Sequence, residues 1–395
     1  MNLALDMYQT AAVAVAVLFL GAFLRKRVGF LETFCIPAPV VGGVIFAVFT
    51  CILYVTGVAE FSFDETLKNV CMVIFFTSVG FQANLKVLKS GGKALGIFLG
   101  AVILLIVLQN GAAVGVSYLI GVDPLVGMCT GSIPMVGGHG TAGAFARTLQ
   151  DLGLETANTL ATAAATFGLV AGSLMGGPLS RRLIEKHSLL SGTDETQDVV
   201  MSHEINAVCD KTTHYASAAY QLVIAMGIGT VISGLLSKTG MTFPVYIGAM
   251  IVAAVMRNIS EYSGKFTVPM TEIDDVGSIC LSLFLGIAMI TLKLWQLAEL
   301  ALPLIILLAV QVLLMVLYVN LVMFNIMGRD YDAAVLVAGT CGFGMGATPN
   351  AMANMQAITE RYLPSVKAFL LVPIVGSLFA DFCNTLIITF FINLI

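Results

Sequence analysis

Twelve long apolar runs divide this sequence; eleven of them contain no charged residue, and the last contains only Asp381. A helix needs about 20 apolar residues to cross the hydrocarbon core of a bilayer, and the runs are of that order. Only 11% of the residues are charged, against roughly 25% in an average soluble chain, so they cannot cover a water-facing surface. The pattern predicts an all-α integral membrane protein. In chain order the runs cover 7–24, 33–59, 69–85, 94–122, 124–146, 156–180, 215–237, 239–256, 276–292, 300–328, 333–359 and 368–395.

Two of the runs, 124–146 and 333–359, are crowded with Gly, Thr, Ser, Pro and Asn. Such irregular backbone leaves N–H and C=O groups unpaired, which is costly in contact with lipid. We therefore expect both runs to be re-entrant hairpins buried in protein. The other ten runs predict ten spans, in two sets of five.

The two polar runs carry similar glycine-rich stretches, GSIPMVGGHGT at 131–141 and CGFGMGATPN at 341–350. Two half-length copies of one unit, each with an unwound glycine-rich segment, are typical of secondary transporters. One shift of 207 positions pairs Gly121 with Gly328, Asp123 with Asp330, Gly137 with Gly344 and Thr141 with Thr348.

We expect an N-terminal repeat over 1–186, a polar linker over 187–214 and a C-terminal repeat over 215–395. Because each repeat has an odd number of spans, the second is inverted in the membrane. The two hairpins then enter from opposite faces. Their tips meet near the midplane, where inverted-repeat transporters bind substrate.

Basic residues predict the orientation, because cytoplasmic loops are rich in Lys and Arg. With both termini outside, four basic residues lie outside, namely Lys68, Arg147, Lys238 and Lys293. The other fifteen and the linker are then cytoplasmic, as expected in an inner membrane: Arg25, Lys26, Arg27, Lys86, Lys89, Lys93, Arg181, Arg182, Lys186, Lys211, Arg257, Lys265, Arg329, Arg361 and Lys367.

The glycine-rich stretches are the predicted binding site. Glycine lets backbone approach a ligand closely, and freed carbonyl and N–H groups can coordinate ions or anionic oxygens. Alternatively, the small residues only permit close helix packing. For the substrate we select Ser132, Gly137, Gly138, His139, Gly140, Thr141, Arg147, Gly346, Thr348, Pro349 and Asn350. For the coupling ion we select Thr130, Thr340, Gly344, Asp381 and Asn384.

Three of these residues have more than one interpretation. His139 either binds a substrate carboxylate or braces the hairpin tip, and Arg147 either clamps a carboxylate or lies among the lipid headgroups. Asp381, in the middle of the last span, costs roughly 2.5–3.5 kcal/mol there. It is a Na⁺ ligand, a partner for a substrate ammonium, a proton carrier or half of a structural pair. Three amides within other spans, Gln109, Asn110 and Gln311, are interpreted as helix–helix hydrogen bonds.

At these residues the sequence resembles the bacterial sodium/glutamate symporter family, essentially from end to end. The resemblance implies Na⁺-driven uptake of L-glutamate, ten spans, two re-entrant hairpins, a homodimer, and a substrate-carrying unit that moves past a static scaffold. It is carried by GSIPMVGGHGTAGAF (131–145), ATFGLVAGSLMGGP (165–178), CLSLFLGIAMITLKLW (280–295), YDAAVLVAGTCGFGMGATPNAMANMQAITER (331–361) and VPIVGSLFADFCN (372–384).

One position departs from the family motif, which has a serine directly before GGHGT where this chain has Val136. Aspartate and related dicarboxylates therefore stay open as substrates. A carrier of another small carboxylate, coupled to Na⁺ or to H⁺ through Asp381 or His139, is the alternative. An intramembrane enzyme is disfavoured because the chain has no GxSxG motif or catalytic dyad. We expect no cofactor, no bound metal beyond transported Na⁺, and no nucleic-acid partner.

Charge balance constrains the coupling. A glutamate ion carries one net negative charge, so import with a single Na⁺ moves no net charge across the membrane. Each charge moved across 100 mV is worth about 2.3 kcal/mol. We therefore predict that at least two cations accompany each substrate.

Overall fold

The computed structural model describes residues 2–29, 31, 36–86, 92–189, 211–238, 243–244, 246–297 and 300–395. Most of the expected linker, residues 190–210, lies outside them. The described part is helical except for two short strands, β1 (Asn2–Leu5) and β2 (Glu60–Phe63), which form a parallel pair. The sequence analysis missed these strands because four residues are too few to show a periodic pattern.

Most helices follow the apolar runs, but the helix over 246–263 ends seven residues beyond the run 239–256, and the helix over 270–290 begins six residues before the run 276–292. They are α1 (Met7–Arg27), α3 (Ala38–Val55), α4 (Thr66–Gln82), α6 (Gly92–Leu119), α7 (Pro124–Met128), α8 (Ser132–Met135), α9 (Gly138–Asp151), α10 (Ala157–Lys186), α11 (Lys211–Ser237), α12 (Tyr246–Ser263), α13 (Met270–Ile290), η1 (Leu294–Leu297), α14 (Ala301–Tyr318), the π-turn η2 (Val319–Met323), α15 (Phe324–Ile326), α16 (Tyr331–Gly344), α17 (Thr348–Thr359), α18 (Val366–Pro373), the π-turn η3 (Ile374–Phe379) and α19 (Ala380–Leu394).

Within the described residues, seven helices are long and apolar enough to cross a membrane. They are α1, α3, α6, α10, α11, α13 and the continuous segment from α14 to α15. The segment from α18 to α19 is an eighth if it counts as one span, since it bends by 45° at η3. Pro373 lies at this bend, where its ring and missing N–H interrupt helical hydrogen bonding.

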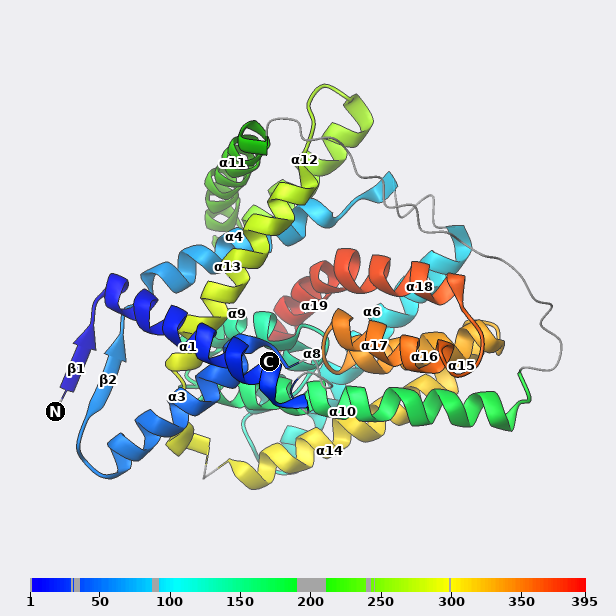
Figure 1. Ribbon diagram of the computed structural model, residues 1–395, viewed down its shortest axis with the longest axis horizontal. Coiled ribbons are helices and arrows are strands. Elements are labelled where there is room, and N and C mark those ends of the chain that lie inside the picture. The colour runs from blue at the N-terminus through cyan, green and yellow to red at the C-terminus, as the bar shows by residue number, and fades with distance from the viewer. Residues whose placement is uncertain are drawn as a thin grey trace.

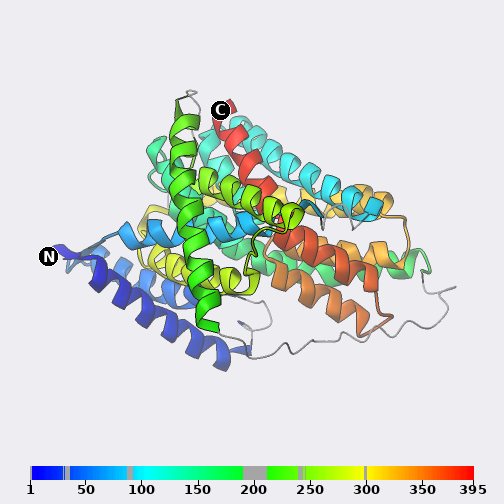
Figure 2. The same ribbon diagram turned by 90° about the horizontal axis from the view of Figure 1, so that it is seen from above.

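The helices form two packed groups (Figures 1 and 2). The six-helix group consists of α1, α3, α4, α11, α12 and α13, and lies at the left and top of Figure 1. The broken-helix group consists of α6 to α10 and α14 to α19. Each group combines segments from both halves of the chain, so neither half is an independent domain.

Glycine lets α1 and α3 cross at backbone contact. A methyl group added at Gly21 would lie 2.0 Å from the carbonyl oxygen of Ala38, and one added at Gly42 would lie 2.0 Å from that of Val17. Small residues at such crossings allow the dispersion contacts that hold helices together within lipid.

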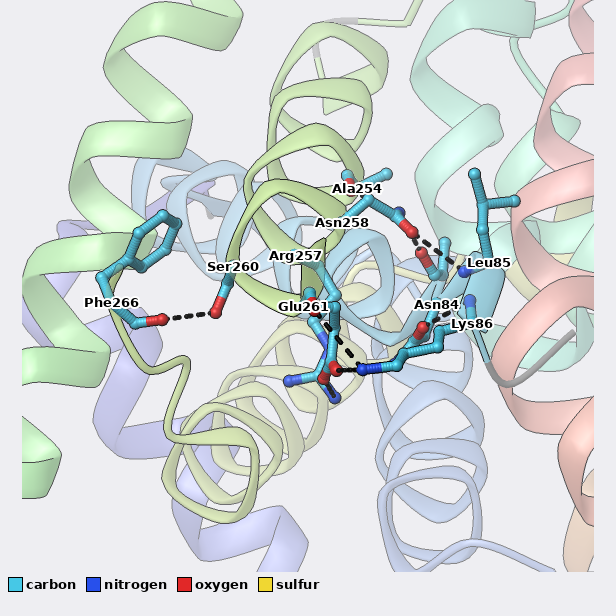
Figure 3. Close-up of polar contacts among 10 residues, drawn as sticks. Asn84, Leu85, Lys86, Ala254, Arg257, Asn258, Ser260, Glu261 and Phe266 are labelled. Atoms are coloured by element: carbon cyan, nitrogen blue, oxygen red, sulfur yellow. Dashed lines mark hydrogen bonds and ion pairs between the residues drawn. The ribbon is translucent and has the colours of Figure 1, made fainter. Parts of the chain in front are cut away.

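Hydrogen bonds join the end of α4 to α12 inside the six-helix group (Figure 3). Asn258 donates to the carbonyl of Ala83 at 2.7 Å and accepts from the Leu85 amide at 2.9 Å. Beside it, Lys86 lies 3.9 Å from the Glu261 carboxylate. These contacts bind a segment of the first half of the chain to one of the second half.

Where α9 faces α13, the boundary between the two groups is apolar. Methyl groups added at Gly140 and Gly143 of α9 would contact Leu281 and Phe284 of α13, respectively. Asn158 of α10 supplies polar contacts across the boundary, donating to the Ala288 carbonyl at 3.2 Å and to the Thr291 hydroxyl at 3.4 Å. Few hydrogen bonds therefore fix the position of one group relative to the other at this contact.

We predict that Gly42→Ala lowers the stability of the protein by about 1–3 kcal/mol, because the new methyl group forces α1 and α3 apart. The measurement is the thermal denaturation midpoint in detergent. Gly96→Ala is the control, since no atom lies within 4 Å of a methyl group added there. Equal midpoints for the two variants would contradict the close crossing.

Candidate functional site

The first helix break, residues 129–137, lies between α7 and α9 and contains the short α8. The Asp123 carboxylate caps α7 by accepting a hydrogen bond from the Leu125 amide at 2.8 Å. At the far side of the break, Gly138 has a φ of +57°. Residues with a Cβ rarely adopt this left-handed conformation, so glycine is required for the chain to turn into α9.

The second helix break, residues 345–347, lies between α16 and α17. Here the Asp330 carboxylate caps α16 by accepting from the Ala333 amide at 2.7 Å. Ala347 is fully extended, with φ −158° and ψ 160°. Pro349 lies in the first turn of α17, where its missing N–H has no helical partner to lose.

The two breaks meet in the interior of the broken-helix group. A methyl group added at Gly138 would lie 3.0 Å from the carbonyl oxygen of Gly346. At Gly168 of α10, an added methyl would lie 2.3 Å from the Met345 carbonyl and 3.3 Å from the Met135 sulfur. The absence of side chains at these glycines therefore brings both breaks against each other and against α10.

Two adjacent amides of α6 bind one break each. Gln109 donates to the Gly344 carbonyl at 2.8 Å. Asn110 donates to the Ser132 hydroxyl at 2.8 Å and accepts from the Ser132 amide at 2.9 Å. Gln311 of α14 donates in turn to the Gln109 carbonyl at 2.9 Å. Side chains of long helices thus satisfy backbone groups that the breaks release, as burial requires.

Two further amides hold the breaks from other sides. Asn384 of α19 donates to the Ser132 carbonyl at 3.1 Å. Asn350 of α17 donates to the Leu169 carbonyl at 3.1 Å and to the Ser173 hydroxyl at 3.0 Å, both on α10. Four of these amides, Gln109, Gln311, Asn350 and Asn384, donate to backbone carbonyls and are 0% exposed.

The side-chain oxygens of these four amides have no hydrogen-bond partner among the described residues. Their orientations are determined, because each NH₂ group already donates to a backbone carbonyl and a flipped amide would set two acceptors face to face. A buried acceptor left unpaired costs about 1–3 kcal/mol. Four such oxygens, in amides that bond to the breaks or to the helices beside them, can coordinate a cation or accept from a ligand with N–H donors.

The last helical segment contacts both breaks, with Asp381 between the contact points. A methyl group added at Gly376 would lie 3.3 Å from the Thr348 hydroxyl at the start of α17. Eight positions later, Asn384 reaches Ser132 in the first break. Asp381 lies in the first turn of α19, and no hydrogen bond or ion pair of its carboxylate occurs within the described chain.

The other predicted site residues divide between the breaks and their surroundings. The His139 ring is buried, and its Nε2 lies 3.0 Å from the Thr166 hydroxyl of α10. Thr130 and Thr340 donate their hydroxyls to backbone carbonyls of Gly127 and Leu336. Gly137 ends the first break, and Gly140 and the buried Thr141 follow it in α9. The half-buried Thr348 and the exposed Pro349 begin α17.

Arg147 is exposed on α9, away from the contact between the breaks, and lies within electrostatic range of Lys68. Lys68 lines a polar cavity of about 510 Å³ at the boundary of the two groups, together with residues of α3, α9 and α10. Its ammonium group forms an ion pair with Glu65 at 2.7 Å. The lining includes Asn158, whose buried amide oxygen has no hydrogen-bond partner in the part of the chain that the structure describes.

The sequence analysis assigned Gln109, Asn110 and Gln311 to helix–helix hydrogen bonds and did not connect them with the breaks. They do bond between segments, but their acceptors and donors include Gly344 and Ser132, at the ends of α16 and α8. Their mid-span position was the available signal. What sequence could not supply was which unwound carbonyls lie opposite them.

A buried pair of helix breaks between apolar helices is typical of secondary transporters in the membrane. This chain belongs to the sodium/glutamate symporter family, whose sequence profile matches residues 3–364. It is therefore a multi-pass membrane protein.

The chain is similar to two sodium/glutamate symporters over almost its whole length. It is 40% identical to that of Escherichia coli (strain K12), covering 99% of this chain and 98% of the relative. It is 41% identical to that of Haemophilus influenzae, covering 97% and 96%. Among solved structures, a sodium proton antiporter from Methanocaldococcus jannaschii covers 97% of this chain and 96% of its own, at 13% identity and a TM-score of 0.43, too low to carry an argument.

We predict that Gly138→Ala abolishes most transport, because the methyl group strains the backbone and presses on the Gly346 carbonyl. Gly121→Ala is the matched control: Gly121 has a φ of +70°, but nothing lies within 4 Å of an added methyl group. Both variants should lose about 1–2 kcal/mol of stability from left-handed strain. Uptake assays on folded protein that find equal activities would contradict a functional contact between the breaks.

Proposed function

We propose that this chain is a secondary transporter that couples Na⁺ influx to uptake of L-glutamate across the inner membrane. Its family and its relatives' names support the substrate and the ion. The observation that carries the site is the set of four buried, anchored amide oxygens around the meeting breaks.

The proposed ion site uses oxygen ligands. Unwound carbonyls and helix C-terminal ends suit Na⁺, and both are present where α16 ends at Gly344. The free oxygens of Asn350 and Asn384 add neutral ligands, and Asp381 adds a negative charge three residues before Asn384. Thr130 and Thr340 belong to the same proposal, since a donating hydroxyl keeps its lone pairs for a cation.

The proposed substrate site uses the opposite helix ends. α9 and α17 both begin at a break, and the N-terminus of a helix attracts carboxylates through its free N–H groups and dipole. His139, Thr141 and Thr348 lie at these ends, and Ser132 begins α8 within the first break. All four can add hydrogen bonds to a dicarboxylate. We assign Arg147 an earlier step, attraction of the anion to the outer cavity that Lys68 lines.

We propose ten spans in two inverted repeats. Gly121 and Gly328, which the repeat aligns, both have positive φ, and each precedes an aspartate helix cap by two residues. Contacts between helix ends agree with the sides of the membrane on which we expect those ends. Expected outer segments meet where Tyr54 stacks on Trp295, with ring centroids 4.0 Å apart. Expected cytoplasmic segments meet where Tyr362 donates to Glu185 at 3.4 Å.

We further propose an elevator-type movement, in which the broken-helix group carries the substrate past the six-helix group. The boundary is mostly apolar where Gly140 and Gly143 of α9 face α13. This supports sliding, because few hydrogen bonds have to break there. In this proposal the six-helix group forms the static scaffold and a homodimer, as the resemblance to the family implies.

A second candidate is H⁺ coupling with another small carboxylate as substrate. The Asp381 carboxylate favours it: it forms no ion pair among the described residues, and a proton can neutralise such an aspartate. Val136 favours a different dicarboxylate, because it replaces a hydroxyl with an apolar group in the first break.

For the topology, we predict that a cysteine at Lys293 reacts with a membrane-impermeant maleimide in intact spheroplasts. A cysteine at Lys265 should react only after the membrane is permeabilised. Both native lysines are exposed, so access depends on the side of the membrane. Labelling is measured by gel shift in a cysteine-free background. Both positions reacting from outside would contradict the proposed ten-span arrangement.

For the function, we predict that the purified protein in liposomes accumulates radiolabelled L-glutamate only with an inward Na⁺ gradient. Asp381→Asn should reduce this uptake at least about tenfold, because losing one cation–carboxylate contact typically costs more than 1.4 kcal/mol. Asp64→Asn is the control, since Asp64 caps Thr66 on the proposed outer surface.

Two further measurements in the same assay test the number of cations and distinguish Na⁺ coupling from H⁺ coupling. An inside-negative potential should accelerate uptake if at least two cations accompany each substrate, and no response would exclude that stoichiometry. Uptake that ignores Na⁺ and follows a pH gradient would replace Na⁺ coupling by H⁺ coupling.

A further inference from the structure

A second cavity lies away from the helix breaks, at the far end of α10. It has a volume of about 730 Å³ and is formed by the last turns of α10, the end of α17 and the residues that follow α17. Figure 1 shows these segments side by side at one end of the broken-helix group. On the proposed topology this end faces the cytoplasm. The proposed transport cycle uses none of its residues.

The rim of the cavity is strongly basic. Four cations, Arg181, Arg182, Lys186 and Arg361, line it together with one carboxylate, Glu185. Arg181 is neutralised by Glu185 at 2.7 Å. No carboxylate lies within 4 Å of the other three cations among the described residues. Arg361 still lies within electrostatic range of Glu185, but four cations against one carboxylate leave the hollow with a net positive charge that attracts an anion.

The floor of the cavity is apolar and continues along one face of α10. Pro178 and Ile358 belong to the lining. Phe167, Leu174 and Arg181 recur every seven residues, which places them on one helix face with Pro178. Phe167 and Leu174 are exposed large apolar side chains, as expected for a surface in contact with acyl chains. The cations therefore lie at the end of an apolar stripe on α10.

From this arrangement we propose that the cavity binds the phosphate headgroup of an anionic phospholipid of the cytoplasmic leaflet, with its acyl chains along the stripe of α10. Basic pockets between helices on this side of a membrane suit such headgroups. The apolar stripe selects a lipid over a soluble phosphate, because a soluble anion gains nothing from it. Since α10 also contacts both breaks, the bound lipid lies on an element of the transport site.

The test measures lipid binding to the full chain in neutral detergent by native mass spectrometry, with phosphatidylglycerol and phosphatidylcholine of identical acyl chains as probes. Wild type should prefer phosphatidylglycerol. The triple variant Arg182→Gln, Lys186→Gln, Arg361→Gln should bind it at least about tenfold more weakly, because three side-chain cations that attract the headgroup are removed. The variant Arg182→Lys, Arg361→Lys keeps the charge and should retain wild-type affinity within about threefold.

The matched control removes three cations from the same proposed face at a different helix, with Arg25→Gln, Lys26→Gln and Arg27→Gln in α1. It should leave the phosphatidylglycerol affinity unchanged. Equal losses in both triple variants would mean diffuse attraction without a site and would overturn the proposal. Equal binding of the two lipids to wild type would overturn it too. So would displacement of phosphatidylglycerol by millimolar inorganic phosphate, which would make the ligand a soluble anion.

Discussion

Two interrupted helices within a membrane protein impose the constraint on which this structure depends. Each interruption releases backbone N–H and C=O groups that lipid cannot satisfy. The protein satisfies them with buried amides on the surrounding long helices, such as Asn110 on Ser132 and Gln109 on Gly344. The breaks therefore cannot exist without α6, α10 and α19 around them, and the two halves of the chain must interlock.

The same arrangement gives the site its chemical character. Four of the anchoring amides, Gln109, Gln311, Asn350 and Asn384, use the NH₂ group on a backbone carbonyl, which leaves the amide oxygen without a partner among the described residues. The interior thus presents acceptors and one carboxylate, Asp381, but few donors apart from the starts of α9 and α17. Cations and ammonium groups suit the acceptors, whereas carboxylates suit the helix starts. An amino acid with an acidic side chain and a co-transported cation match this division of charge.

Much of this arrangement was predictable along the chain. The low charge content predicted apolar helices, and Gly, Pro and hydroxyl residues correctly located both interruptions, because these residue types disrupt helices locally. The role of Gln109 was not predictable, because its acceptor, Gly344, lies 235 positions away. The pair of strands at residues 2–5 and 60–63 was also missed, since each gains its hydrogen bonds from the other and not from its own sequence.

By itself, the sequence determined the class of protein, the positions of the helices and the residue types at the breaks. These follow from hydropathy and backbone sterics, which act over one or two helical turns. Only the tertiary structure decided that the breaks touch at Gly138 and Gly346, that helices of both halves form each group, and that four amide oxygens stay unpaired. Those features depend on which donors and acceptors meet across the fold, and a linear pattern does not encode such distances.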